Sequence, residues 1–126
     1  MGSPLEIKNI RIVESKIVYL EESNSDWDFN FNVELFYGED TKKAGKIEII
    51  CEGKEFSGDE SNYLKIKIQS EFFVSSESEE EFGHFVLNAV SITFPYLRSH
   101  ITTLTSSVGM NPVIIPPLNV HELLSE

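Results

Sequence analysis

The sequence predicts an α+β domain in which a four-stranded antiparallel meander sheet is packed by a long, proline-kinked C-terminal helix. An extended proline-rich link and a short terminal helix are expected to follow. Three observations predict this class: apolar residues recur at every second position up to Val74, at every third or fourth position from Phe82, and prolines cluster near the end. We treat residues 1–126 as one domain, of which residues 1–3 fit a remnant of cloning.

The strands are predicted from period-two alternation, with apolar side chains on one face and mostly polar ones on the other. This pattern covers residues 5–20, 27–37, 46–52 and 63–74. The first stretch alternates less cleanly, and we expect a bulge in it. The polar segments between the strands are predicted turns, at residues 21–26, 38–43 and 53–62. Consecutive strands with short connections favour a meander that is wet on one face.

The apolar period changes at Ser76, and a helix is predicted to follow. Ser78 and Glu81 fit a capping box, and the helix is expected to end near Gly109. One apolar stripe consists of Phe82, Phe85, Val86, Ala89, Thr93 and Leu97, and a second consists of Leu87, Val90, Phe94 and Ile101. A sheet covers only one stripe, so we expect this helix to be buried on two sides. Pro95 predicts a kink within it.

The net charge of −11 is concentrated in the sheet-forming part. After residue 81 the only charged side chains are Arg98, Glu122 and Glu126. An acidic chain does not neutralise phosphates, so we expect no nucleic-acid partner. Polar residues interrupt every membrane-length stretch of the C-terminal third, and no signal-peptide pattern opens the chain. We therefore expect no membrane insertion and a cytoplasmic location.

The sequence offers no positive sign of catalysis. Cys51 falls on the apolar side of a predicted strand, the histidines lack metal-ligand spacing, and the aspartates fall in predicted turns or on the wet face. Nucleophile-elbow, P-loop and dinucleotide-binding motifs are absent from the sequence. We expect no enzymatic activity, no metal and no cofactor, although a small-molecule-binding or enzymatic domain on the same scaffold stays open as an alternative.

The C-terminal third carries a specific motif. Residues 94–102 read F-P-Y-L-R-S-H-I-T, and Gly109 and then I-P-P-L-N-V at residues 115–120 follow. This run resembles the SecB protein-export chaperones, whose long helix carries an F-P-Y-A-R-x-x-I-T block before a glycine and an L-A-P-V-N-F segment. The Asp26-Trp27 pair also has a counterpart in many members of that family. The order of segments agrees over nearly the whole chain.

The resemblance implies an ATP-independent chaperone that binds unfolded preproteins in apolar grooves between the sheet, the long helix and the link. The residues then expected to bind client polypeptide are Trp27, Phe73, Tyr96, Ile114, Ile115, Leu118 and Val120. SecB-like proteins form dimers through sheet edges, and two dimers join through their long helices into a homotetramer. The second helix stripe is therefore the expected oligomer interface, namely Leu87, Val90, Phe94 and Ile101.

The resemblance also implies an acidic sheet face for the translocation ATPase SecA. The candidate residues are Asp28, Glu34, Glu48 and Glu71. Export members often continue past the last helix with a polar tail that engages SecA, whereas this sequence ends at Glu126. The alternative is a dedicated SecB-like chaperone or interaction partner of one client, such as the antitoxin of a toxin–antitoxin pair.

Overall fold

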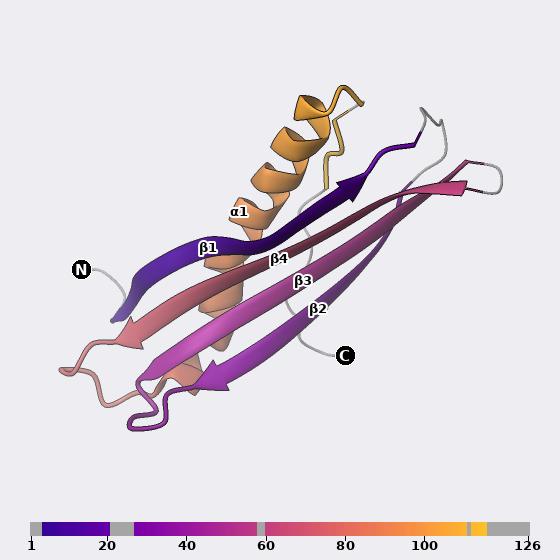
Figure 1. The fold of residues 1–126 in the computed structure, drawn as a ribbon. Coiled ribbons are helices and arrows are strands. Elements are labelled where there is room, and N and C mark those ends of the chain that lie inside the picture. Colours follow the sequence, from indigo (N-terminus) through magenta and orange to yellow (C-terminus); the bar gives the residue numbers. More distant parts are fainter. Residues whose placement is uncertain (1–3, 21–26, 58–59, 111, 116–126) are drawn as a thin grey trace.

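A computed structural model describes residues 4–20, 27–57, 60–110 and 112–115 (Figure 1). Its antiparallel sheet consists of β1 (Leu5–Val18), β2 (Asp28–Tyr37), β3 (Ala44–Ser57) and β4 (Glu60–Val74), in the order β1-β4-β3-β2. A short 3₁₀ helix, η1 (Phe82–Phe85), leads into α1 (Val86–Ser107), which covers one face of the sheet. We call this the inner face and the opposite one the outer face. The predicted α+β class is confirmed.

The strand order departs from the predicted meander, because β1 pairs with β4 and not with β2. The predicted order holds for β2, β3 and β4 only. The connection over residues 19–27 can span about 30 Å when extended, whereas two edges of a four-stranded sheet are only about 14 Å apart. The connection is thus long enough to cross the sheet, so neighbours in sequence need not become neighbouring strands.

The hairpin between β3 and β4 is longer than predicted, since β3 continues to Ser57 and β4 begins at Glu60. Polar residues made this stretch read as a turn, yet two of them occupy core-facing positions. Asn62 Nδ2 donates a hydrogen bond to Glu55 Oε1 at 2.9 Å, and Asn62 Oδ1 accepts one from the Leu20 N–H at 2.7 Å. Polar side chains with such partners can be buried in a strand.

The expected irregularity of the first strand is confirmed. The β1–β4 register shifts between Ile7 and Asn9 and again between Ile12 and Glu14. By contrast, β2 and β3 pair residue for residue from Asp28 to Tyr37. The two edge strands therefore differ, because one is bulged and the other is regular.

The predicted capping box does not form. Ser78 Oγ accepts a hydrogen bond from the N–H of Glu80, at 3.1 Å, and not from that of Glu81. The N–H of Phe82 donates to Lys42 O at 2.8 Å, in the turn between β2 and β3. Docking of Phe82 onto this turn therefore sets the helical start, and neither η1 nor α1 has a side-chain cap.

The core lies between α1 and the inner faces of β3 and β4. Its fully buried members from the sheet are Ile47, Ile49, Cys51, Leu64, Ile66, Ile68 and Val74. The helical part buries members of both predicted stripes, including Phe82, Ala89, Val90, Phe94, Leu97 and Ile101. Each large side chain buried in this way contributes about 1.5–3 kcal/mol to folding. Pro95 lies within α1 at an exposed position, and Gly109, with φ of 85°, follows the helix near its expected end.

In the described ranges, no helix combines the length and the hydropathy needed to cross a bilayer.

Candidate functional site

Three aromatic side chains lie in a row on the inner face at the edge of the sheet, and we call them the aromatic ladder: Trp27, Phe29 and Phe31. The rings of Trp27 and Phe29 are stacked, with centroids 5.7 Å apart and planes at 15°. Those of Phe29 and Phe31 are 6.2 Å apart at 28°. Alternate residues of a strand share a face, which explains the row. All three side chains are only half-buried, so part of each ring meets solvent.

The ladder rests on β3 and joins α1 at one end. Phe29 pairs in register with Gly53, and a Cβ added to Gly53 would lie 2.5 Å from Phe29 Cε1 and 3.2 Å from Trp27 Cε3. Because Gly53 has no side chain, the rings of Phe29 and Trp27 can lie against β3 at this position. At the other end, Phe31 meets Phe94 of α1 edge-on, with centroids 5.6 Å apart.

Residues 112–115 run along α1 and are bound to it by side-chain hydrogen bonds. Arg98 Nε donates to Ile115 O at 2.8 Å, and Thr102 Oγ1 donates to Val113 O at 2.8 Å. The N–H of Val113 donates in turn to Thr105 Oγ1 at 2.8 Å. The uncharged run of α1 thus contains one cation, Arg98, which binds the backbone of residues 112–115. We call these four residues the link.

Two of the predicted client-binding residues, Ile114 and Ile115, are neighbours in the link but differ in exposure. The Ile114 side chain is 75% exposed, whereas Ile115 is 3% exposed and belongs to the core. The prediction for Ile115 is therefore corrected, because alternate residues of an extended segment point in opposite directions. Ile114 lines a cavity of about 340 Å³ with Pro95, Arg98, Ser99, Thr102, Thr103 and Ile115. Leu118 and Val120 lie outside the described residues.

The solvent side of α1 is apolar or uncharged. Tyr96 is 56% exposed and Ile92 is 40% exposed. Tyr96 also lines a cavity of about 300 Å³ between α1 and β1, with Ile10, Arg11, Ile12, Ile68, Ser99, His100 and Thr103. His100 Nε2 lies 3.0 Å from Ser15 Oγ, and burial lowers the pKa of this histidine.

The predicted oligomer stripe is mostly core within one chain. Val90, Phe94 and Ile101 are buried against the chain's own sheet and link, and only Leu87 is half-buried. The prediction of a second stripe free to meet a partner is corrected for these three residues, because they belong to the core of the single chain, and Phe94 packs against Phe31 of β2. Sequence spacing could not reveal that the link packs back onto the helix.

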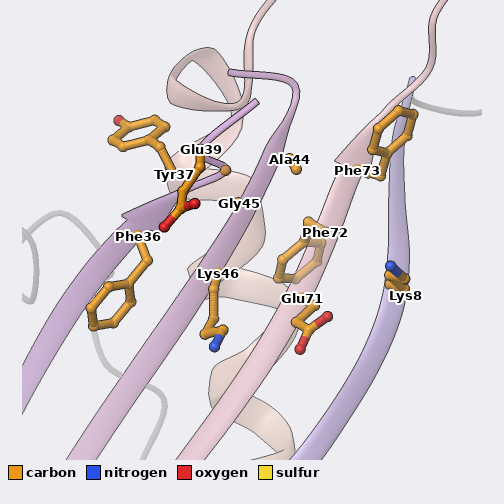
Figure 2. Close-up of a pocket in the computed structure, with 11 residues that line it drawn as sticks. Lys8, Phe36, Tyr37, Glu39, Ala44, Gly45, Lys46, Glu71, Phe72 and Phe73 are labelled. Carbon is orange, nitrogen blue, oxygen red and sulfur yellow. The ribbon is translucent and has the colours of Figure 1, made fainter. Parts of the chain in front are cut away.

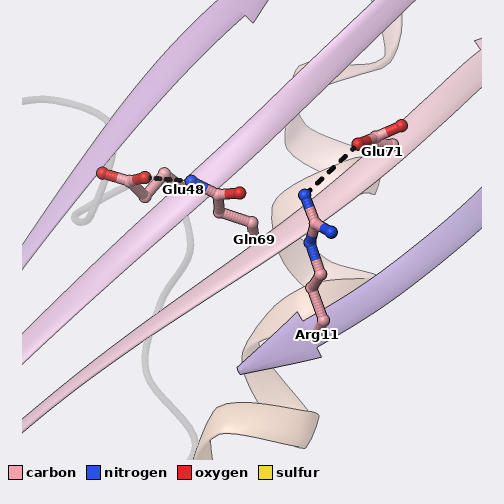
Figure 3. A network of polar contacts seen from close by, with 4 residues as sticks. All are labelled: Arg11, Glu48, Gln69 and Glu71. Atoms are coloured by element: carbon pink, nitrogen blue, oxygen red, sulfur yellow. Dashed lines mark hydrogen bonds and ion pairs between the residues drawn. The ribbon is translucent and has the colours of Figure 1, made fainter. Parts of the chain in front are cut away.

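The outer face carries the four predicted acidic residues but is not an acidic surface. Its carboxylates are Glu6, Glu14, Asp28, Glu34, Glu48, Glu52 and Glu71, and they are interspersed with Arg11, Lys16, Lys46, Lys54, Lys65 and Lys67. Figure 3 shows two of the contacts: Glu71 Oε1 lies 3.9 Å from Arg11 Nη2, and Gln69 Nε2 donates to Glu48 Oε2 at 2.6 Å. The expectation of an acidic face is corrected to one of mixed charge.

A cavity of about 310 Å³ opens on the outer face at one end of the sheet (Figure 2). Phe36 of β2 and Phe73 of β4 lie on either side of it, with the charged side chains of Lys8, Glu39, Lys46 and Glu71 between or beside them. Phe73, one of the predicted client-binding residues, is exposed. It lies on the opposite face of the sheet from the aromatic ladder, so the structure does not bring it together with Trp27.

Sequence reasoning did not name Phe29 and Phe31 as candidate site residues. The alternation of residues 27–37 placed them on the apolar face of the sheet and gave them no further role. The signal was present in the run Trp27–Phe31, with an aromatic ring at every second position. This pattern indicates partly exposed rings only if β2 is an edge strand. The sequence does not reveal the order of the strands.

The described residues contain no cluster of metal-ligating side chains. Cys51 is buried in β3, and burial raises the pKa of its thiol to about 12. A thiol of that pKa carries almost no thiolate at neutral pH, so Cys51 is a poor nucleophile in the folded chain.

Comparison with known proteins supports the fold. No family model matches the chain. It is 28% identical over 122 residues to the uncharacterized protein MJ0357 of Methanocaldococcus jannaschii, covering 94% of this chain and 78% of that protein. Among solved structures it is similar, at a TM-score of 0.74, to the Mycobacterium tuberculosis Rv1957 SecB-like chaperone in complex with a ChAD peptide from the Rv1956 HigA1 antitoxin. That match is 16% identical and covers 91% of this chain and 88% of the other.

A protein of unknown function from Streptococcus agalactiae matches at a TM-score of 0.52, with 8% identity over 93% of this chain and 100% of that one. The resemblance carried by residues 94–102 thus has a structural counterpart, and the chain has the fold of the SecB-like chaperones.

Proposed function

We propose that this chain is an ATP-independent chaperone that holds unfolded polypeptide segments on the aromatic ladder. The observation that carries the proposal is the row of half-exposed stacked rings formed by Trp27, Phe29 and Phe31 at the edge of the sheet. The SecB-like fold supports it, as does the antitoxin peptide bound to the Mycobacterium tuberculosis relative.

The physical basis is burial of apolar area. Covering accessible ring surface gains about 25 cal/mol per Å² whatever the side chain that covers it. A row of flat rings therefore accepts many sequences, which suits a protein that must recognise chains by their lack of structure. Since these rings are already stacked on Gly53 and against Phe94, little side-chain ordering is left to oppose binding.

The oligomer is proposed to use the solvent side of α1 in place of the buried stripe. Ile92 and Tyr96 are exposed there, and the helix carries no charge on that side except at the edge, where Arg98 is engaged by the link. Apolar, uncharged helix surface of this kind is typical of contacts between subunits. Dimers of dimers that join through α1 would bury it, with Leu87 at its margin.

Two kinds of client fit the site. An export chaperone would pass preproteins to SecA in the cytoplasm, and a dedicated chaperone would hold one client such as an antitoxin. The mixed charge of the outer face favours the second, because a basic partner would meet lysines and an arginine interspersed among the carboxylates over the described strands.

The test is suppression of aggregation. Unfolded citrate synthase is diluted into buffer with the purified chain, and light scattering is followed for the native sequence, Phe29→Ala and Phe36→Ala. The two variants remove aromatic rings from the same strand, but on opposite faces. We expect Phe29→Ala to lose most of the protection and Phe36→Ala to retain it. If the native sequence protects citrate synthase, equal protection by the two variants would contradict the proposal.

The choice between clients needs a second measurement. A dedicated chaperone would leave citrate synthase to aggregate yet retain one protein from its own source in a pull-down, and Phe29→Ala would release it. Retention that is unaffected by Phe29→Ala would place the client elsewhere on the surface.

A further inference from the structure

The outer-face cavity at the end of the sheet lies apart from the proposed client site. It has a volume of about 310 Å³, and Phe36 of β2 and Phe73 of β4 stand on either side of it (Figure 2). Both rings are exposed, by 44% and 38%. Small-molecule sites in proteins have volumes from about 300 to 1,000 Å³ and walls that are mostly apolar or aromatic. The cavity therefore has the size and the walls of a site for a small molecule.

The floor between the two rings is formed by β3. Ala44 is the register partner of Phe73, and Lys46 is the register partner of Phe36, so all four side chains lie on the outer face. Figure 2 shows Ala44 between the strands that carry the two rings. A long side chain at position 44 would fill this space, whereas the methyl group of alanine leaves it open. A flat apolar group can thus lie over Ala44 and touch both rings.

The charged side chains around the cavity favour an anion. Lys8 and Lys46 both line it, and in the part of the chain that the structure describes neither forms an ion pair. Glu71 already has a cation of its own, because Arg11 Nη2 lies 3.9 Å from Glu71 Oε1. Glu39 is the other carboxylate of the lining and is exposed on the turn after β2. Two ammonium groups thus lack a carboxylate partner, although the net charge of the chain is −11.

The backbone under the cavity also supports the start of the helical part. On the inner face Phe82 packs so closely against Gly45 that a Cβ on this glycine would lie 2.0 Å from Phe82 Cδ2. The Phe82 N–H donates to Lys42 O at 2.8 Å, and the Gly38 N–H donates to Ala44 O at 3.0 Å. Gly38, Ala44 and Gly45 line the cavity on the outer face. A ligand in the cavity would therefore rest on the same backbone that holds Phe82.

We propose that this cavity binds a small anion with a flat apolar body, such as an aryl carboxylate. The apolar body lies over Ala44 beside Phe36 and Phe73, and the carboxylate meets the ammonium groups of Lys8 and Lys46. Because the ligand binds the folded chain, it stabilises the turn between β2 and β3 and, through this turn, the start of η1. The inference goes beyond the proposed function and does not depend on it, since the aromatic ladder lies on the opposite face.

The first test compares three probes that share a naphthalene ring: the anion naphthoate, the neutral naphthamide and the cation naphthylmethylammonium. Each is titrated into the isotope-labelled chain while amide chemical shifts are followed. We expect naphthoate to bind at least about threefold more tightly than naphthamide, and the cation to bind most weakly, because each probe fills the same space and only the charge differs. Equal affinities of the three probes, or a preference for the cation, would overturn the assignment of an anion site.

The second test changes the cavity itself. Ala44→Leu fills the floor, and we expect it to weaken naphthoate binding by at least about fivefold. Lys46→Gln keeps the length of the side chain but removes its charge, so it should abolish most of the preference for naphthoate over naphthamide. Lys54→Gln is the matched control, because Lys54 is exposed on the same face of β3 but does not line the cavity. A loss of preference as large in Lys54→Gln as in Lys46→Gln would show that overall charge is responsible and would overturn the role of Lys46.

Amide hydrogen exchange then shows where the ligand lies. Saturation with naphthoate should slow exchange at Gly38 and Phe82 in the native sequence, and circular dichroism shows whether Ala44→Leu is folded. If Ala44→Leu is folded, the same probe concentration should leave its exchange unchanged; if it is not, Lys46→Gln takes its place and should show weaker protection. Chemical shifts and protection confined to the aromatic ladder, with Gly38 and Phe82 unaffected, would place the probe on the other face and overturn the proposal.

Discussion

The Phe29 ring occupies the space that a side chain at Gly53 would fill. These residues are register partners on β2 and β3, and a Cβ on Gly53 would lie 2.5 Å from Phe29 Cε1 and 2.6 Å from Cδ1. Carbon atoms of side chains do not approach so closely, so the flat position of Phe29, and the stacking of Trp27 upon it, require glycine. A glycine in one strand thus determines the surface of its neighbour.

Replacing Gly53 with alanine should displace the aromatic ladder. We expect weaker client binding, a shift in Trp27 fluorescence and a loss of stability of about 1–3 kcal/mol, because a rigid ring must move. The control is Gly83→Ala, whose Cβ would meet the outer end of the Tyr37 side chain, with Oη at 3.2 Å and ring carbons no nearer than 3.7 Å. Urea unfolding and peptide titration measure both effects. Unchanged affinity in Gly53→Ala would show that the position of the ring does not matter for binding.

Charges introduced on the two sides of α1 should act differently. Ile92→Glu changes an exposed side chain, so we expect a smaller particle in gel filtration with the fold retained by circular dichroism. Val90→Glu places a carboxylate in the core, so we expect unfolding. An Ile92→Glu variant of unchanged size would contradict assembly through the exposed side of α1.

The link should depend on Arg98. Arg98→Ala removes the donor to Ile115 O, and a hydrogen bond from a charged group contributes about 1.5–3 kcal/mol. We expect faster amide hydrogen exchange at Val113 and Ile115 in this variant. Thr103→Ala is the control, since Thr103 is exposed on the same helix. Identical exchange in the two variants would show that the core contacts of Ile115 hold the link without Arg98.

Acid should weaken the contact between α1 and β1. Burial lowers the pKa of His100 below its usual value of 6.5, so the folded chain takes up a proton less readily than the unfolded chain. The contribution of His100 to the free energy of unfolding is complete above the pKa that this histidine has in the unfolded chain. It falls as the pH drops from that value towards the lower pKa of the folded chain. We expect the urea midpoint to fall less between about pH 7.5 and about pH 5.5 in His100→Gln than in the native sequence. His84→Gln, at an exposed position, should behave like the native sequence; an equal fall in all three would refute the role of His100.

Local features of the fold could be predicted from the sequence, because alternation and helical spacing depend on neighbours in the chain. The inward positions of Ile47, Ile49 and Cys51, the bulged first strand and the helix that ends near Gly109 all follow from such patterns. The capping box failed because Phe82 is held by Lys42, which is distant in sequence.

The site was harder to predict, because it depends on strand order and on long-range packing. Trp27 could be named, but not its neighbours in the aromatic ladder, since their exposure follows from β2 being an edge strand. Phe73, Tyr96 and Ile114 are exposed, yet they lie on separate surfaces. Val90, Phe94 and Ile101 are buried in the chain's own core, and Ile115 joins that core where Arg98 holds its carbonyl group.

The central claim is that clients bind on the inner face at β2. It is tested most directly by placing a photo-reactive benzoylphenylalanine at position 29 or at position 36 and irradiating the chain with an unfolded client. Both are aromatic positions on one strand that face opposite sides of the sheet. We predict cross-links to the client from position 29 and few from position 36. Cross-links from position 36 alone would place the client in the outer-face cavity beside Phe73 and contradict the account.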